Sequence, residues 1–289
     1  MNQEKMQVAD TKKYASAIVP KDALFDLRLK EIWRYRDLLL LFVKRDFVAK
    51  YKQTVLGPVW FFIQPIFQTA ILALVFAGMA SLSTDGIPPI LFYLAGITCW
   101  NYFANCLRTT SNTFTANASL FGKVYFPRAV TPLSIIISNL IQFGIGLVLF
   151  LLLYLYFVVT GADLLPNTSL LLLPVLIVLM GLMGLGLGML VSAMTTKYRD
   201  LQYLVDFGVQ LLMYATPVIL PLSAVPDKYR PLMLANPMTG IIETFKYGFF
   251  STGTFSWELL GYSAGFTIVV FLLGLVVFNY TEKNFMDTV

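Results

Sequence analysis

Few side chains in this sequence of 289 residues could perform catalysis, and they are scattered among long apolar segments. The sequence has no histidine, which is the commonest general acid and base in enzymes. No nucleophilic side chain in the apolar segments has an evident activating partner. The sequence also lacks the motif G-x-x-x-x-G-K-[ST], so no phosphate-binding P-loop is expected in this chain. These features argue against an enzyme and favour a role in binding or transport.

The charged side chains nearest to apolar segments offer candidates for ligand contact. Arg108 follows Ile90 by 18 residues, about 27 Å along a helix at 1.5 Å per residue. It is therefore expected near the cytoplasmic border, where two interpretations remain open: the side chain reaches the membrane surface, or it contacts an anionic substrate. Asp206 is expected to pair with Arg199 or with a neighbouring helix, and Glu243 and Lys246 have the spacing for a pair on one helical face.

Metal binding is not predicted. Cys99 and Cys106 lie seven residues apart on one face of an apolar segment, a position typical of buried thiols that act as small hydrophobic groups. No spacing of cysteine with carboxylates resembles a zinc ligand set. No cofactor is expected in this chain.

Aromatic residues make up 15% of the chain and crowd into its first two apolar segments. Most of them are expected to face lipid or to form an interfacial belt. The alternative is a channel lining on which sugar rings stack, because Trp and Tyr offer a flat apolar surface with a polar edge. The candidates for this substrate channel are Trp60, Phe61, Phe62, Tyr93, Trp100, Tyr102, Phe103 and Arg108.

A short basic connector at residues 117–128 combines an apolar cluster with two cations. This composition is typical of a loop that docks on a soluble protein. The predicted docking residues are Leu120, Phe121, Lys123, Val124, Tyr125, Phe126, Pro127 and Arg128. The only other short charged loop on the same side is predicted to form a lesser contact through Tyr198, Arg199 and Asp200.

The elements that position these residues are expected to be membrane helices. Hydrophobic residues make up 57% of the chain and charged residues only 13%, which leaves too little polar surface for a soluble domain. The apolar runs are long and continuous, without the alternation of a barrel strand. The sequence therefore predicts an all-α integral membrane protein with about six transmembrane helices, near residues 55–79, 90–113, 131–159, 169–194, 203–220 and 259–278.

The distribution of basic residues predicts the orientation. Twelve of the 21 Lys and Arg precede residue 55, and 17 in all fall on one side of the predicted membrane. The positive-inside rule then places both termini in the cytoplasm. Residues 1–23 form a polar tail without the apolar region of a cleavable signal peptide. Residues 24–54 read as an amphipathic interface helix, residues 55–280 as the six-helix domain, and residues 281–289 as a cytoplasmic tail.

Three local patterns refine the transmembrane domain. The first span contains Gln64-Pro65 and Gln68, which predicts a distorted helix whose amides face protein or a cavity. In the fourth span, Gly184 and Gly188 form a face that allows close approach of another helix. Residues 221–257, between spans five and six, contain prolines and an apolar stretch too short to cross, so one or two re-entrant half-helices are expected, with an ordinary external loop as the alternative.

Several of these segments together resemble the ABC-2 type transporter permeases that export lipid-linked polysaccharides such as O-antigen, capsule or teichoic acid. The similarity covers residues 30–289. It rests on Lys44-Arg-Asp-Phe47, Tyr51-Lys-Gln-Thr-Val-Leu-Gly57, Trp60, Gln64-Pro65, Lys123-Val-Tyr-Phe-Pro-Arg128, Tyr198-Arg-Asp200, Asn236-Pro237 and Phe285-Met-Asp-Thr-Val289.

The resemblance implies a homodimer in the bacterial cytoplasmic membrane, with a channel between the two copies for the polymer. It implies two separate ATP-binding cassette subunits that bind ATP and Mg²⁺ and that move the connector at residues 120–126 when they close. Membrane lipids and lipid-linked polysaccharide are the expected partners, and nucleic acid is not. Two alternatives remain: an ABC-2 exporter of drugs or lipids, and an ion-coupled secondary transporter, for which no inverted repeat and few buried carboxylates are found.

Overall fold

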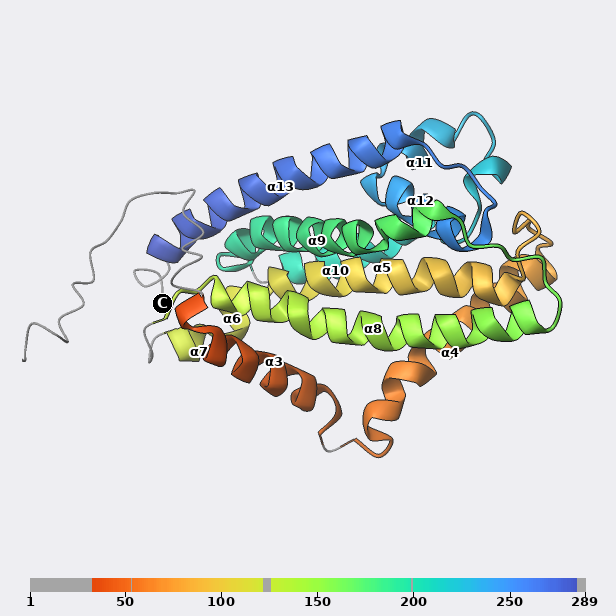
Figure 1. The fold of residues 1–289 in the computed structure, drawn as a ribbon. Coiled ribbons are helices and arrows are strands. Elements are labelled where there is room, and N and C mark those ends of the chain that lie inside the picture. The colour runs from red at the N-terminus through yellow and green to blue at the C-terminus, as the bar shows by residue number, and fades with distance from the viewer. Residues whose placement is uncertain (1–32, 53, 122–125, 199, 285–289) are drawn as a thin grey trace, which may run out of the picture.

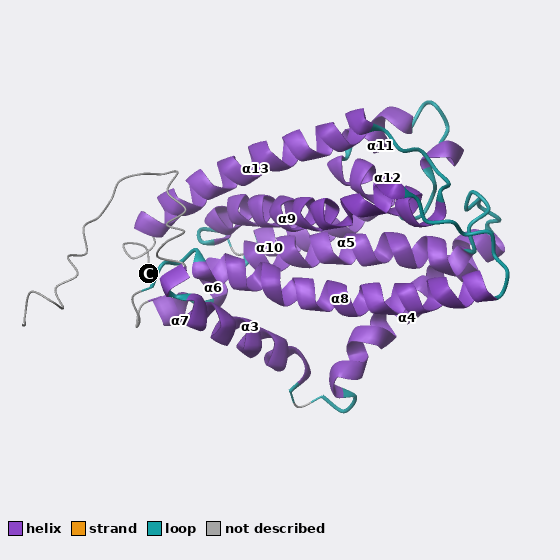
Figure 2. Cartoon of the chain, viewed as in Figure 1, coloured by secondary structure: helices purple, strands orange, loops and turns teal. Residues whose placement is uncertain are grey.

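The computed structural model describes residues 33–52, 54–121, 126–198 and 200–284. Helices build this part of the chain, and none of its residues lies in a β-strand (Figures 1 and 2). The predicted all-α architecture is thus confirmed. Five helical segments are long and apolar enough to cross a bilayer: Gly57–Met79, Pro89–Ser111, Val130–Val159, Thr168–Thr195 and Trp257–Thr281. They correspond to five of the six predicted spans.

The first of these segments is not a regular helix. It begins with the 3₁₀ turn η1 (Gly57–Val59), continues as α4 (Trp60–Leu72) and ends in the π-helical η2 (Ala73–Met79). Pro65 lies inside α4, where it cannot donate the backbone hydrogen bond of an ordinary helical residue. The predicted distortion of the first span is therefore present.

Helix α5 (Pro89–Ser111) is the centre of the bundle. It packs against α9 (Leu173–Thr195) and α8 (Val130–Val159), while the first span, through α4, covers a further side. The turn η3 (Thr168–Leu172) leads into α9, and α13 (Trp257–Asn284) lies along the opposite face of α9 (Figure 1).

Close contact between α5 and α9 depends on two glycines. A Cβ atom on Gly184 would lie 2.8 Å from the carbonyl oxygen of Phe103, and one on Gly188 would lie 2.9 Å from that of Leu107. These distances are too short for any side chain, which confirms the predicted small-residue face. Gly186 allows a similarly close contact on the other face of α9, because a Cβ there would lie 2.8 Å from Cα of Phe271 in α13.

The fifth predicted span is shorter than expected. Residues 203–220 were predicted to cross, whereas α10 (Leu201–Tyr214) has 14 residues and a spanning helix needs about 20. Thr216 precedes Pro217, and a residue before proline is disfavoured in the helical conformation. The chain accordingly leaves the helix at Ala215 and continues in a turn.

The segment between α10 and α13 contains η4 (Leu222–Ala224), α11 (Arg230–Ala235) and α12 (Pro237–Phe250). Helix α12 has the length of the expected half-helix and is buried against α5, α9 and α13. Its start is fixed by Asn236, whose side chain accepts a hydrogen bond of 3.0 Å from the backbone of Met238. It ends at Ser251, which adopts a left-handed conformation with φ 53°.

Glu243 and Lys246 in α12 are both buried, and they bind separate partners instead of each other. Oε2 of Glu243 accepts hydrogen bonds of 3.3 Å from the backbone and the hydroxyl of Thr254. Nζ of Lys246 donates to the carbonyl oxygen of Pro217 and lies over the ring of Phe92. In place of the predicted pair, these contacts fix α12 to its neighbours.

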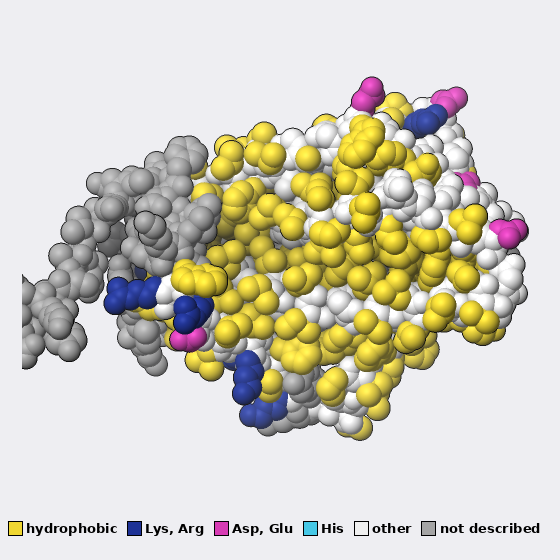
Figure 3. Space-filling view, in the orientation of Figure 1, with side chains coloured by type: hydrophobic (Ala, Val, Ile, Leu, Met, Phe, Trp, Pro, Cys, Tyr) yellow, Lys and Arg dark blue, Asp and Glu magenta, His cyan; other side chains and the backbone are white. Residues whose placement is uncertain are grey.

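Helix α3 (Arg36–Tyr51) is the described part of the predicted interface helix. It packs on α8, and its Phe42 and Val43 are 4% and 7% exposed. It forms a V with α4 at one side of the bundle (Figure 1). The face in Figure 3 carries a broad hydrophobic band, with Lys and Arg mostly at the end near α3 and Asp and Glu mostly at the other end. This pattern is typical of a membrane domain.

Candidate functional site

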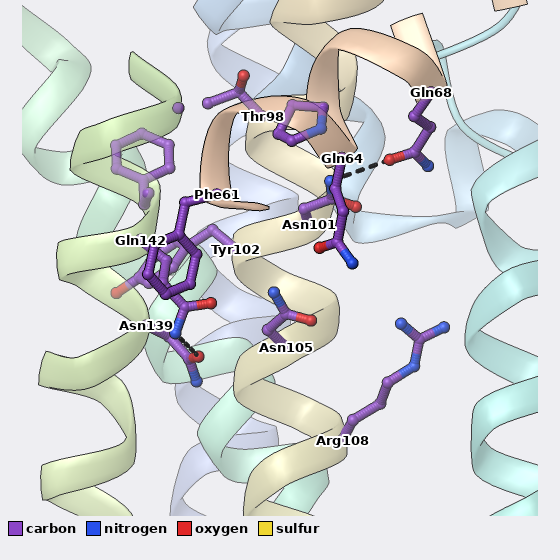
Figure 4. A pocket seen from close by; sticks show the side chains of 13 residues that line it. Phe61, Gln64, Gln68, Thr98, Asn101, Tyr102, Asn105, Arg108, Asn139 and Gln142 are labelled. Atoms are coloured by element: carbon purple, nitrogen blue, oxygen red, sulfur yellow. Dashed lines mark hydrogen bonds between the residues drawn. The ribbon is translucent and has the colours of Figure 1, made fainter. Parts of the chain in front are cut away.

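A polar cavity of about 420 Å³ lies between α4, α5 and α8. Six of its side chains are carboxamides, one is a guanidinium, and aromatic rings close parts of the wall (Figure 4). The lining residues are Phe61, Gln64, Pro65, Gln68, Thr98, Asn101, Tyr102, Asn105, Arg108, Asn139, Gln142, Phe143 and Gly146. Polar groups at membrane depth are costly unless they serve protein contacts or a hydrated cavity, so this cavity is the strongest candidate for a functional site.

Helical spacing brings the carboxamides together. Gln64 and Gln68 are four residues apart on α4, and Asn101 and Asn105 are four apart on α5, with Arg108 one turn further along. Residues at these separations share one face of a helix. Three helices thus direct polar stripes toward a common space, although each helix is apolar over most of its surface.

Hydrogen bonds join the stripes at two places. Nδ2 of Asn101 donates to Oε1 of Gln68 at 3.2 Å, which links α5 to α4. Nδ2 of Asn139 donates to Oγ1 of Thr109 at 3.1 Å, which links α8 to α5. The same Asn139 accepts from Gln142 at 3.5 Å (Figure 4). The cavity wall is therefore held by side chains with spare donor and acceptor capacity.

Two cations reach this region from different helices. Nε of Arg108 lies 3.3 Å from Oδ1 of Asp206 in α10, and both side chains are partly exposed. Nζ of Lys50, near the end of α3, lies 3.4 Å from Oδ1 of Asn139. The expected partner of Asp206 on a neighbouring helix is thus Arg108. The other expected candidate, Arg199, lies outside the described residues.

The predicted channel aromatics divide into three groups. Phe61 and Tyr102 line the cavity together with Arg108. Tyr93, Trp100 and Phe103 are at most 3% exposed and pack in the core around α5, because that helix is covered by neighbours on most sides. Trp60 and Phe62 lie on the outer surface of α4, 43% and 36% exposed. Only the first group lines the cavity, and within it Tyr102 is itself 3% exposed.

Asn101, Asn105, Asn139 and Gln142 were not among the residues predicted from the sequence. The signal for them was present, because polar residues repeat at helical spacing within two spans that are otherwise apolar. The amides of Gln64 and Gln68 were expected to face protein or a cavity, and they line this one.

Part of the predicted docking connector is packed against the helical bundle. Phe121, in α7 (Ala118–Phe121), and Phe126 are each 5% exposed, and they pack with Phe42, Phe114 and Phe278. Pro127 is buried, Leu120 is half-buried and the guanidinium of Arg128 lies 5.3 Å from the ring centroid of Phe121. Phe121 and Phe126 thus anchor the connector to α3, α6 (Thr113–Ala116) and α13.

The remaining docking candidates are exposed or lie outside the description. Tyr198 is 54% exposed, with Nζ of Lys197 5.3 Å from its ring centroid, and Asp200 is exposed as well. The other four predicted docking residues, Lys123, Val124, Tyr125 and Arg199, are outside the described residues.

A bundle of apolar helices around a polar cavity defines this chain as a membrane protein of the transporter type. The chain belongs to the ABC-2 type transporter family, whose profile matches residues 37–250. It is 28% identical to the O-antigen export system permease protein RfbA of Myxococcus xanthus over 90% of this chain and 98% of that protein. It is 26% identical to a protein of the same name from Klebsiella pneumoniae, over 87% of this chain and 94% of the relative. It is 23% identical to the polysialic acid transport protein KpsM of Escherichia coli, over 84% and 93% of the two chains.

Proposed function

We propose that this chain is the permease subunit of an ATP-driven exporter that moves lipid-linked polysaccharide across the cytoplasmic membrane. The observation that carries the proposal is the cavity lined by six carboxamides inside an apolar bundle. Carboxamides both donate and accept hydrogen bonds, as the hydroxyls of a sugar do. The names of the relatives, which describe export of O-antigen and transport of polysialic acid, support polysaccharide as the cargo.

The proposal includes a second copy of the chain and two ATP-binding cassette subunits. ATP and Mg²⁺ would be bound by those subunits, and both termini would be cytoplasmic. The first span and α10 expose apolar side chains, with Phe67 64% and Tyr203 80% exposed, and this surface would be covered by lipid and by the second copy. The surface that includes α7 and the exposed Tyr198 is where an ATPase would dock.

Export by whole cells tests the function. Cells without the gene are expected to accumulate lipid-linked polysaccharide inside and to lose it from the surface, and the intact gene is expected to restore it. Membrane vesicles that contain the permease and its ATPase should then move the polymer only when ATP is supplied. Unchanged surface polysaccharide with a lost resistance to drugs would favour the drug-exporter alternative, and transport driven by an ion gradient without ATP would favour a secondary transporter.

A matched pair of variants tests the docking surface. Tyr198→Ala is expected to lower co-purification of the ATPase several-fold while the permease yield is unchanged, because the side chain is exposed. Phe126→Ala is expected to lower the yield of the permease itself, since truncation of a buried Phe costs about 3 kcal/mol or more. Normal ATPase capture by Tyr198→Ala would remove this loop from the docking surface.

A further inference from the structure

The charges around the cavity favour an anion. The described lining residues include Arg108 and no carboxylate, and the ammonium of Lys50 contacts the lining residue Asn139 from α3. The carboxylate that Arg108 meets, Asp206, belongs to α10, outside the lining. A cavity with cations at its wall and a low-dielectric surround concentrates anions.

Arg108 is incompletely used by the protein. Its contact with Asp206 joins one nitrogen to one oxygen at 3.3 Å, and among the described residues this buried Nε has no partner in hydrogen-bonding geometry. A guanidinium carries five N–H donors in a planar fork. The pairing therefore leaves donors that an oxyanion can take in the two-point geometry that arginine favours.

Carboxamides line the same cavity as this guanidinium. In Figure 4 the side chains of Gln64, from α4, and Asn105, from α5, extend into the same open space as the end of Arg108. Each carboxamide offers two donors and one acceptor oxygen. A bare anion would not need these acceptors, and a neutral sugar would not need the guanidinium. The combination fits a ligand that carries hydroxyls and an oxyanion together.

We infer that Arg108, Gln64 and Asn105 form a subsite for an anionic sugar. The guanidinium binds a phosphate or carboxylate group of the ligand, and the two carboxamides bind neighbouring hydroxyls. Asp206 holds Arg108 in place when the subsite is empty and is displaced from it when the anion arrives. This inference rests on the proposed function, because it names the part of the polysaccharide substrate that the cavity recognises.

Two probes that differ only in the anion test the subsite. The intact permease in phosphatidylcholine nanodiscs is titrated with a decyl sugar phosphate and with the decyl glycoside of the same sugar. We expect the phosphate probe to bind about tenfold more tightly, as one charge-assisted pair provides. Equal affinity for the two probes would overturn the inference.

Variants separate recognition of the ligand from support of the fold. Arg108→Gln is expected to abolish the preference for the phosphate probe, and Asp206→Asn to increase it, because the competing carboxylate is gone. The double variant Arg108→Asp with Asp206→Arg restores the ion pair but turns a carboxylate toward the carboxamides, so the preference should remain absent. Full preference in that double variant would show that Arg108 acts only through the ion pair. Arg230→Gln, which removes an exposed cation outside the cavity, is the matched control and should bind both probes normally.

Competition identifies the source of the anion. Inorganic phosphate that displaces the sugar phosphate at equal concentration would overturn the sugar part of the inference. Nanodiscs of phosphatidylglycerol that erase the preference would assign the site to an ordinary lipid headgroup. Because these titrations use the permease alone, their failure leaves the ATP-dependent export of the proposed function intact, and failed export leaves the titrations interpretable.

Discussion

Helix α5 and the first span line the same cavity, yet the bundle holds them in opposite ways. In an apolar stretch of 18 residues within α5, 83% of the residues are buried inside the molecule. In the corresponding stretch of the first span, 11% are buried. The buried helix is also the more polar one, with Asn101, Asn105 and Arg108 on one face. Lipid is as apolar as a leucine side chain, so hydrophobicity does not draw helices inward in a bilayer. The polar face of α5 instead meets protein partners at the centre of the bundle, Gln68 of α4 and Asp206 of α10.

This difference assigns distinct roles to the two walls of the cavity. Helix α5 is fixed by α8, α9 and α12, whereas the first span contacts the bundle mainly through α5 and α8 and exposes residues such as Phe67 and Leu74. It also contains Pro65 and a π-helical end, and both interrupt the regular α-helical pattern of backbone hydrogen bonds. We therefore expect the first span to move when the cavity opens, and α5 to stay in place.

The largest effect is expected from overpacking the fixed wall. Gly188→Ala places a methyl group 2.9 Å from the carbonyl oxygen of Leu107 in α5, whereas Gly78→Ala in the first span meets nothing closer than 3.7 Å. We expect the first change to lower the free energy of unfolding by about 2 kcal/mol and the second to change it by less than about 0.5 kcal/mol. Denaturation in mixed micelles measures both. Equal losses would show that the two walls are held equally firmly.

A smaller but functional effect is expected from tying the walls together. Gln68 of α4 and Asn101 of α5 are in contact at the cavity wall, with 3.2 Å between Oε1 and Nδ2. Cysteines in their place can be joined by a short bis-maleimide. Both native cysteines, Cys99 and Cys106, are fully buried and shielded from the reagent. If the first span moves, the tether should slow export at least about tenfold, with assembly unchanged.

The control for this tether is the same double-cysteine variant treated with a monofunctional maleimide, which adds similar bulk without a link. It is expected to export at a rate near that of the untreated variant. Export by the tethered protein at the control rate would mean that the first span stays in place during transport.

The same contrast explains what could be predicted from the sequence. Run length and apolarity were enough for five spans, and the spacing of Gly184 and Gly188 was enough for the tight contact of α9 with α5. The position of an aromatic ring was not predictable, because core and lipid are equally apolar: Trp100 is buried and Trp60 is exposed, although both lie in apolar segments.

Tertiary contacts decide the remaining cases. Phe126 lies in a connector with the composition of a docking loop. The ring centroids of Phe42 and Phe121 lie 5.6 and 5.7 Å from that of Phe126, and Phe126 is buried. Lys246 has the spacing to pair with Glu243, but the carbonyl oxygen of Pro217 lies within its reach. The carboxamide stripe on α5 was within reach of sequence reasoning, and only its convergence with α4 and α8 required the structure.

The smallest effect is expected at the hydrogen bond that joins the two walls, between Nδ2 of Asn101 and Oε1 of Gln68. Gln68→Leu, Asn101→Leu and the double variant form a thermodynamic cycle that isolates this pair. Hydrogen bonds between membrane helices are worth about 0.6 kcal/mol on average, because unpaired groups find other partners. In this cavity those partners are the neighbouring carboxamides, so we expect a coupling of about that size. The control cycle pairs Gln68→Leu with Asn167→Leu. Asn167 donates to the carbonyl oxygen of Tyr247 instead, so this cycle should give additive effects. A coupling above about 2 kcal/mol for Gln68 and Asn101 would make this bond a firm clamp, and a first span clamped in that way could not serve as the movable wall.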